Sequence, residues 1–571
     1  MKIPNSSRRF WFRGKFDFGS DRWLFNLSWL VLLLFASALL FSIFVPVYSD
    51  EVATKLILAR AFDEGWTLVS LFPQCKSSFI SSLPLTWYPA ATFYGVIYSK
   101  LELLGLRIVG IGGAIVWIAV MVYWSLNVVR SWTLRLYTIA ALIALNSFGV
   151  LPFILVLARP EQILVLCIAY YCIVPLFLRF DKTHSFWLHV LIVTSFVLIT
   201  SVFYYSHPKA LFFTPLVLAS VICSVQLRRW QYLIPLMFFI FATVYQSYDH
   251  AKLVYQCDEA PILRAELALN TINPSLLASN PKVFFVDAIK NLISAPRKIV
   301  KHVPLQKNYQ SGWLPPSPGA GGLLAKILGV VTKVFFVLSF LTVFFFSIRK
   351  VLTEFKERKI TTQSIIATML ALSLLVHIAL YNAWHFYTPG LIFPALIILA
   401  LLMWGEYLEK VPVVPLARIT LASLLVFAAL NLGVLLVKVV PQMVRQSKSH
   451  GASLKDQWLS VSPFQFDIQR TTIRSLALQC NIEGDGVDRL IVDHATYYAF
   501  DRLREPIHVL YISEVAFGKD IEGREIIPFL TEIKSPGIIA RCDYIPPALR
   551  DSAKSSHGYC CVGGAELKCK K

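Results

Sequence analysis

Residues 45–66 read VPVYSDEVATKLILARAFDEGW and close a long apolar run at 23–47. Two adjacent carboxylates, Asp50 and Glu51, therefore stand where the chain leaves that run. One interpretation is helix capping, because side-chain oxygens such as those of Ser49 and Asp50 accept hydrogen bonds from free backbone N–H groups at a helix start. The other is an active site at the outer face of a membrane, and the rest of the chain must decide between them.

The composition is that of a membrane protein. The chain has 571 residues, of which 56% are hydrophobic and 15% charged, whereas a soluble domain carries about 25% charged residues. Many apolar runs reach about 20 residues, the length that spans a bilayer. The first run lacks a small-residue cleavage site and is therefore expected to remain as a helix. The net charge of +20 then indicates basic cytoplasmic loops and no nucleic-acid partner.

The apolar runs predict about eleven transmembrane helices. They lie at 23–47, 107–129, 136–157, 161–179, 185–205, 209–227, 230–248, 323–347, 362–382, 387–405 and 414–438. One further run, at 84–106, is ambiguous. If it lies on the outer surface without crossing, the basic clusters around Arg130, Lys182 and Arg228 all fall on the cytoplasmic side, which fits the positive-inside rule. We therefore expect 84–106 to be interfacial.

This topology divides the chain into three parts. Residues 1–22 are expected to be cytoplasmic and 23–440 to form the transmembrane domain, with outer loops at 49–106 and 249–322. The first loop should carry amphipathic and interfacial helices. Residues 441–571 are expected to form a small extracytoplasmic α/β domain, because strand-like runs such as RLIVDHATYYAF alternate there with helical ones. Five of the ten cysteines lie in this tail, where an oxidising compartment would permit disulfides whose pairing sequence alone leaves open.

Ionisable side chains gather near the predicted outer ends of the helices, and His377 is the main exception inside them. A proton- or ion-coupled transporter would keep such groups at mid-membrane depth. Carboxylates beside cations at headgroup level suit the transfer of a sugar from a lipid phosphate. A carboxylate can take the proton of an acceptor hydroxyl, and cations can stabilise the leaving phosphate.

Four features of the sequence resemble the GT-C superfamily of integral membrane glycosyltransferases. YSDEVA after the first helix resembles the acidic motif of that family's first outer loop, and the residues at 52–66 have the spacing of an amphipathic helix. ARPEQILVL resembles the second-loop motif, and HFYTPGLIFPALIILALL the late motif at a helix start. The layout is most similar to the branch of the protein O-mannosyltransferases and lipid A aminoarabinose transferases. Here Glu161 replaces the more usual Asp, and His385 a frequent Arg.

The resemblance implies roles for specific residues. Asp50 would be the catalytic base, with Glu51 sharing or orienting that role, and Arg159 and Glu161 would form the second-loop site. The candidate donor-phosphate ligands are His207, Lys209, His385, Tyr387, Lys55, Arg60, Arg297, Lys298 and Lys301. For each, a structural interpretation stays open: capping for Asp50, mutual pairing for Arg159 and Glu161, and a solvated or headgroup-facing surface for the others.

The expected function is therefore transfer of a sugar from a polyprenyl-phosphate donor to a glycan, lipid or protein acceptor. The expected location is the inner membrane of a cell, with the N-terminus cytoplasmic and the tail periplasmic or extracellular; an ER membrane protein of the same topology is the alternative. No metal is expected to be required, although carboxylates could hold a divalent cation. The rival functions are a lipid or sugar transporter or flippase, and a non-catalytic envelope assembly protein.

Overall fold

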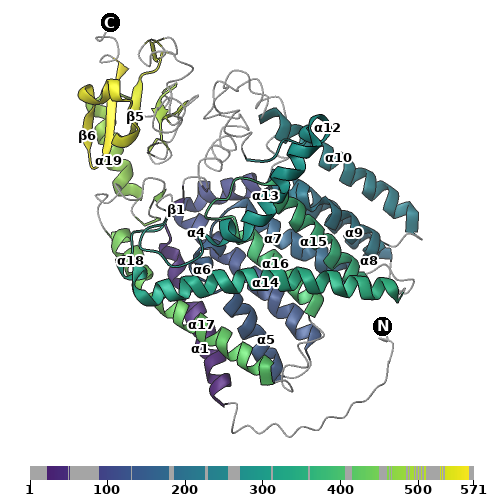
Figure 1. The fold of residues 1–571 in the computed structure, drawn as a ribbon. Coiled ribbons are helices and arrows are strands. Elements are labelled where there is room, and N and C mark those ends of the chain that lie inside the picture. The colour runs from purple at the N-terminus through teal and green to yellow at the C-terminus, as the bar shows by residue number, and fades with distance from the viewer. Residues whose placement is uncertain are drawn as a thin grey trace.

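The computed structural model describes residues 22–48, 51, 89–129, 132–178, 186–225, 229–254, 270–309, 313–357, 360–404 and 415–448, and parts of 460–509 and 528–564. Most of these residues are helical, and a small sheet lies at one end of the helices (Figure 1). The expected amphipathic helix at 52–66 and the cytoplasmic segment at 1–21 lie outside the described residues.

The described part of the chain contains sixteen α-helices. Their bounds are α1 Arg22–Phe41, α4 Pro89–Val128, α5 Trp132–Leu145, α6 Leu151–Leu155, α7 Pro160–Phe177, α8 Phe186–Ser206, α9 Thr214–Val225, α10 Trp230–Val254, α12 Leu276–Ser279, α13 Pro281–Val300, α14 Leu323–Lys356, α15 Thr362–Leu380, α16 Pro389–Trp404, α17 Pro415–Val434, α18 Val440–Lys448 and α19 Phe466–Gln479. Four shorter turns join them: η1 Ser42–Phe44, η4 Pro208–Phe213, η7 Pro318–Gly321 and the π-helical η9 Leu435–Val439.

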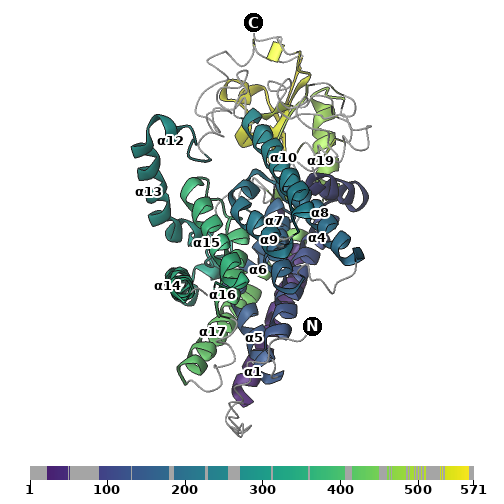
Figure 2. The ribbon, with the colours of Figure 1, turned by 90° about the vertical axis from the view of Figure 1, so that its right-hand side faces the viewer.

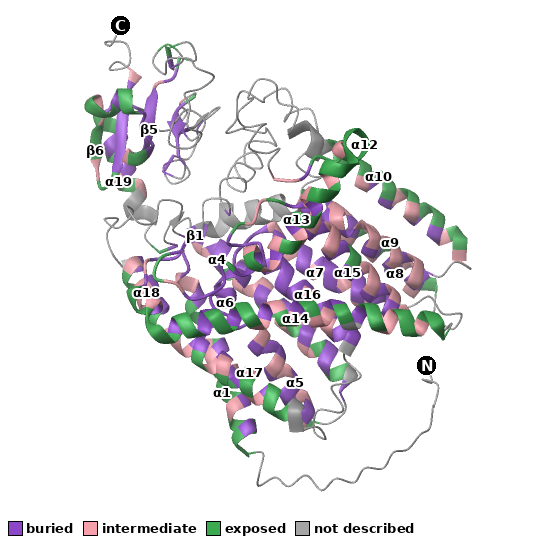
Figure 3. Cartoon of the chain, viewed as in Figure 1, coloured by how far each residue is buried: buried purple, intermediate pink, exposed green. Residues whose placement is uncertain are grey.

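Eight helical segments in the described part of the chain are long and apolar enough to cross a membrane, and two shorter apolar helices, Trp132–Leu145 and Pro389–Met403, accompany them. These are the helices of a multi-pass membrane protein. The predicted number of eleven crossings is not confirmed by this set. The helices bury one continuous apolar core, while the outer faces of peripheral helices such as α14 stay exposed and apolar (Figure 3).

The ambiguous run at 84–106 is not a separate interfacial helix. Within its described part it joins the following run in one helix, α4, of 40 residues, which is about 60 Å long at the α-helical rise. The part of α4 that is apolar enough to cross a membrane is Leu103–Asn127, so the helix is longer than that segment. Gly105 lies between the two runs, but a single glycine costs a helix only about 1 kcal/mol and does not end this one.

The run at 136–157, predicted as one helix, is broken into α5 and α6. Gly149 has a φ of +52°, which costs little only for glycine. A Cβ there would lie 1.7 Å from the carbonyl oxygen of Val303, and that same oxygen accepts a hydrogen bond from the N–H of Val150 at 2.9 Å. Asn431 of α17 donates to the carbonyls of Ser147 and Gly149. Hydrogen bonds to residues distant in sequence, Val303 and Asn431, therefore stabilise the break between α5 and α6.

Two other predicted runs also differ in detail. The run at 209–227 begins as the 3-10 turn η4, because His207 ends the preceding helix and Pro208 starts a new one. The run at 414–438 continues through η9 into α18, which ends at Lys448.

The tail contains a five-stranded mixed sheet in the order β4-β3-β5-β7-β6. Its strands are β3 Ile491–Val492, β4 Ile507–His508, β5 Gly537–Arg541, β6 Lys554–Ser556 and β7 Tyr559–Gly563. β3 is parallel to β4 and β5, whereas β7 is antiparallel to β5 and β6. This sheet, with α19 against it, agrees with the α/β character expected of the tail.

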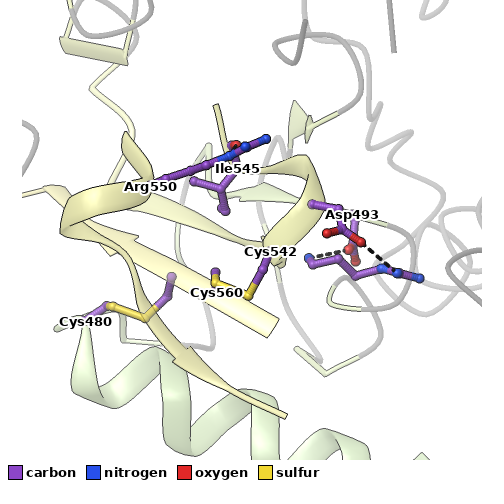
Figure 4. Close-up of a disulfide and its surroundings, with 9 residues drawn as sticks. Cys480, Asp493, Cys542, Ile545, Arg550 and Cys560 are labelled. Atoms are coloured by element: carbon purple, nitrogen blue, oxygen red, sulfur yellow. Dashed lines mark hydrogen bonds and ion pairs between the residues drawn. A yellow bond between two sulfur atoms is a disulfide. The ribbon is translucent and has the colours of Figure 1, made fainter. Parts of the chain in front are cut away.

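Two adjacent cysteines on β7 form disulfides on opposite faces of the sheet. Cys561 is bonded to Cys480 at the end of α19, and Cys560 is bonded to Cys542, as Figure 4 shows for the second pair beside Asp493. Neighbouring side chains on a strand point to opposite faces, so this vicinal pair crosslinks both cores of the sheet. The pairing therefore follows from the strand geometry.

The start of the tail lies beside the exit of α1. β1, Val47–Tyr48, pairs antiparallel with β2, Ser460–Val461. The rings of Phe44 and Phe464 also lie 5.1 Å apart. The acidic motif at 50–51 thus begins at a junction between the helices and the tail.

Candidate functional site

A fully buried ion pair anchors the acidic motif. Nη2 of Arg107, on α4, lies 2.6 Å from Oε2 of Glu51, and its Nη1 lies 3.1 Å from Oε1, and both side chains are 0% exposed. Arg107 also donates to the carbonyls of Val45, Pro46 and Val156. Because a guanidinium presents its donors in a rigid fork, one arginine joins three segments of the chain.

Glu51 completes this junction from the other side. Its Oε1 accepts a hydrogen bond of 2.7 Å from the backbone N–H of Ala158, which immediately precedes Arg159. Glu51 therefore binds the loop that enters α7, in addition to α4. Asp50, the predicted catalytic base, lies outside the described residues, but its neighbour in sequence is held within this junction.

A second buried cluster forms where α7 and η4 begin. Oε2 of Glu161 lies 3.1 Å from Nε of Arg159, and its Oε1 lies 2.6 Å from Nζ of Lys209. All three residues are buried. Arg159 is the N-cap residue of α7, Pro160 follows at the first helical position and Glu161 lies in the first turn, where the helix dipole favours a negative charge. Two cations thus share one carboxylate.

The second cation, Lys209, is positioned by its own turn. Nδ1 of His207 accepts a hydrogen bond from the backbone N–H of Lys209 at 3.1 Å, and Pro208 follows His207 in η4. This is a side-chain cap of η4, and it orients Lys209 towards Glu161. Burial, and then the positive charge of Lys209, lower the pKa of His207, so His207 is neutral and acts as an acceptor at physiological pH.

Aromatic rings from the loop between α15 and α16 line the same cluster. Cζ of Arg159 lies 3.5 Å from the ring centroid of Tyr387, and Nζ of Lys209 lies 4.9 Å from that of Tyr381. These are cation–π distances. The ring of His385 stacks on Tyr387 at 5.1 Å, so the predicted late motif meets the predicted second-loop motif in space.

The loop after α13 reaches His385 from the other side. His302 is buried, and burial, with smaller contributions from Lys301 and His385, lowers the pKa of His302 to about 4. Lys301 is exposed beside it. Lys301, one of the candidate phosphate ligands, therefore lies beside His302, and the charge of His385 also acts on His302.

The other predicted cations near Lys301 lie on α13. Arg297 is exposed, and Nζ of Lys298 lies 3.4 Å from Oδ1 of Asn291 on the same helix. Lys55 and Arg60 lie outside the described residues.

A small cavity adjoins the cluster. Its volume is about 20 Å³, room for about one water molecule. Its lining includes Arg159, Glu161 and Tyr387 together with apolar residues such as Trp117 and Val165. The lining is thus partly charged and partly apolar.

Arg107, Tyr381 and His377 were not predicted as site residues. Arg107 had a usable signal, since a lone arginine within an apolar stretch needs a partner. His377 was noticed as an ionisable residue within a helix; its ring stacks on Tyr381 at 5.1 Å. Within the described part of the chain, no three His, Cys, Asp or Glu residues are grouped as metal ligands, and the expectation that no metal is needed stays a prediction.

Comparison with known proteins adds little at the level of sequence. No protein-family model matches the chain, and no curated protein matches it. Among solved structures, the chain is similar to the archaeal oligosaccharyltransferase AglB from Archaeoglobus fulgidus, determined in complex with an inhibitory peptide and a dolichol-phosphate. The likeness covers 90% of this chain and 69% of that chain, with a TM-score of 0.40 and 8% sequence identity.

Proposed function

We propose that this protein is a membrane glycosyltransferase of the GT-C type that moves a sugar from a polyprenyl-phosphate donor to an acceptor on the outer side of the membrane. One observation carries the proposal: Arg159 and Lys209 converge on Glu161 where α7 and η4 begin, beside the rings of Tyr387 and Tyr381. A lipid phosphate has the matching chemistry, because its anion needs cations and its prenyl chain needs an apolar surface.

In the proposed reaction each of these groups has a defined role. Asp50 takes the proton of an acceptor hydroxyl, whose oxygen attacks the anomeric carbon of the donor sugar. The bond from that carbon to the phosphate oxygen breaks, and its electron pair leaves with the phosphate. Arg159 and Lys209 stabilise the charge that grows there. The anomeric centre is inverted if attack comes from the face opposite the phosphate.

The remaining residues have supporting roles in this proposal. Tyr387 holds the guanidinium plane of Arg159 at 3.5 Å, and His385 stacks on Tyr387 at the exposed side. Lys301, in the loop after α13, is proposed as a further phosphate contact. Lys55 and Arg60, on the first outer loop, are proposed as further phosphate contacts, whereas Glu51 positions Asp50 through Arg107.

We place the enzyme in the inner membrane, with the tail outside, and with a glycolipid, polysaccharide or protein as acceptor. The first test is a mass-spectrometric comparison of envelope glycans in a deletion strain, the same strain with the wild-type gene restored, and one with Asp50→Asn at equal protein level. Loss of a sugar that returns only with the wild type supports the proposal. Full restoration by Asp50→Asn would leave Asp50 as a helix cap, and a deletion without any glycan change would favour a transporter or an assembly protein.

A second test needs no knowledge of the sugar. Purified protein is titrated with polyprenyl phosphate, and retention of the lipid is measured by native mass spectrometry. Lys209→Gln should weaken binding by about 10- to 100-fold, the value of one hydrogen bond to a charged group, and Lys209→Arg should restore part of it. The matched control is Lys326→Gln, an exposed lysine in the first turn of α14. Equal binding by both glutamine variants would refute the phosphate site.

A further inference from the structure

α13 has three distinct faces. It is a helix of 20 residues, about 30 Å long, yet it is not among the segments apolar enough to cross a membrane. Its buried face, with Ala288, Ala295 and Ile299, packs against α14 and α15. Figure 2 shows α13 on the flank of α15, outside the bundle. The other two faces are therefore open.

The second face is an exposed apolar stripe. Phe285, Ile289 and Ile293 recur at every fourth position, and Val286 lies between them on the same side. Their exposed fractions are 56%, 53%, 78% and 42%. Figure 3 shows the exposed residues along α13 and α12. Four large apolar side chains on one side of a helix need a cover other than water.

The third face is cationic and borders the apolar stripe. Lys290 and Arg297 are seven residues apart and exposed, and Lys298 lies beyond them. Asp287 is the one acid on this helix, and it pairs with Lys290 at 3.2 Å on the surface. An apolar stripe flanked by basic residues is the arrangement that lies in a membrane interface, with apolar side chains among the acyl chains and cations at the phosphates.

We infer that α13 lies flat in the membrane interface and that its basic face binds the headgroups of anionic phospholipids. Charge complementarity selects this occupant, since the open face pairs an apolar stripe with cations. Continuity supports it as well, because α13 packs on α14, a crossing helix whose exposed side chains are themselves apolar. In this arrangement Arg297 and Lys298 contact bulk lipid phosphate and not the sugar donor.

This arrangement would also anchor the segment that approaches the candidate site. α13 ends at Val300, and the next residues bring Lys301 and His302 beside His385. The carbonyl oxygen of Val303 accepts the hydrogen bond that holds the break at Gly149 and Val150. The loop after α13, residues 301–303, is therefore fixed at one end to the bundle and at the other to a lipid-bound helix.

The test uses the full-length protein in nanodiscs that contain phosphatidylglycerol and phosphatidylcholine. A photo-crosslinking amino acid replaces Ile289, and the adducts are identified by mass spectrometry. The control position is Leu478 on α19, which is 69% exposed. Lipid adducts are expected at position 289 and not at 478. Adducts to protein at 289 would mean that a second copy or another protein covers the stripe, and would overturn the inference.

Charge is tested separately with Arg297→Gln. The preference of the lipid adducts at 289 for phosphatidylglycerol should fall about fivefold, the effect of one basic residue near an anionic surface. Lys534→Gln, an exposed lysine of the tail, should leave that preference unchanged. A preference equal in wild type and Arg297→Gln overturns the binding of anionic headgroups. Neither measurement depends on glycosyltransferase activity.

Discussion

The buried pair of Arg107 and Glu51 offers the sharpest test of how the candidate site is held together. Three variants are needed: Arg107→Met, which keeps much of the side-chain volume without charge, Glu51→Gln, which keeps shape without charge, and the double variant. The pair joins the end of α1, α4 and the loop before α7. Loss of the pair should therefore destabilise both the segment that carries the acidic motif and the loop that carries Arg159.

The magnitudes follow from the contacts. Arg107→Met leaves the Glu51 carboxylate buried without its ion pair and removes the donor from three carbonyls, so it should cost about 3–5 kcal/mol of unfolding free energy. Glu51→Gln leaves a guanidinium still held by those carbonyls and should cost about 1–3 kcal/mol. The double variant should cost less than the sum, by about 0.5–3 kcal/mol, since no unpaired charge remains.

Unfolding is followed for all variants in one detergent by denaturant titration. The control is Asp287→Asn, which removes an ion pair whose side chains are 71% and 42% exposed and should cost about 0.5 kcal/mol or less. The reasoning is refuted if Arg107→Met destabilises the protein no more than Asp287→Asn. It is equally refuted if the two single effects add without coupling.

Three further predictions concern the fold. Gly149→Ala should destabilise the protein by more than about 2 kcal/mol, because its Cβ would lie 1.7 Å from a carbonyl oxygen at a φ of +52°; Gly112→Ala, with open space around its Cβ, should not destabilise it comparably in the same thermal unfolding assay. Cys560→Ser should cost the tail about 3 kcal/mol of unfolding free energy, since its bond to Cys542 closes a loop of 18 residues. Unfolding of the variant is compared with that of the wild type without reductant, and equal unfolding of the two would contradict this prediction. Stability should fall as pH drops from about 6.5 towards about 4, because the unfolded chain takes up a proton at His302, and at His207, before the folded chain does. His302→Gln should make that part of the stability–pH profile less steep, and an unchanged slope would contradict the prediction.

Much of the helical organisation could be predicted from hydropathy. Most of the predicted runs have a helical counterpart, and some have similar bounds, for example 161–179 with α7 and 185–205 with α8. The failures lie at 136–157 and 84–106. The first was missed because a backbone carbonyl from residue 303 and an asparagine from α17 hold the break, and neither is visible within the run itself.

The candidate site shows the same division. The resemblance to the GT-C family marked Arg159 and Glu161 in the second-loop motif and His385 and Tyr387 in the late motif. It also implied Lys209 as a phosphate ligand. Their partners were beyond local reasoning. That Glu161 serves both cations, and that Glu51 pairs with an arginine 56 residues away, depends on which helices become neighbours.

The sequence by itself determined that the chain is a membrane protein, where most of its helices run and which charged residues lie near their ends, because hydropathy and capping act over a few neighbouring residues. Only the tertiary structure decided the partner of each charge, the break at Gly149 and the disulfide partners of Cys560 and Cys561. A buried charge needs a counter-charge and a buried backbone N–H needs an acceptor, and packing supplies these partners. How close two residues lie in the fold has no fixed relation to their separation along the chain.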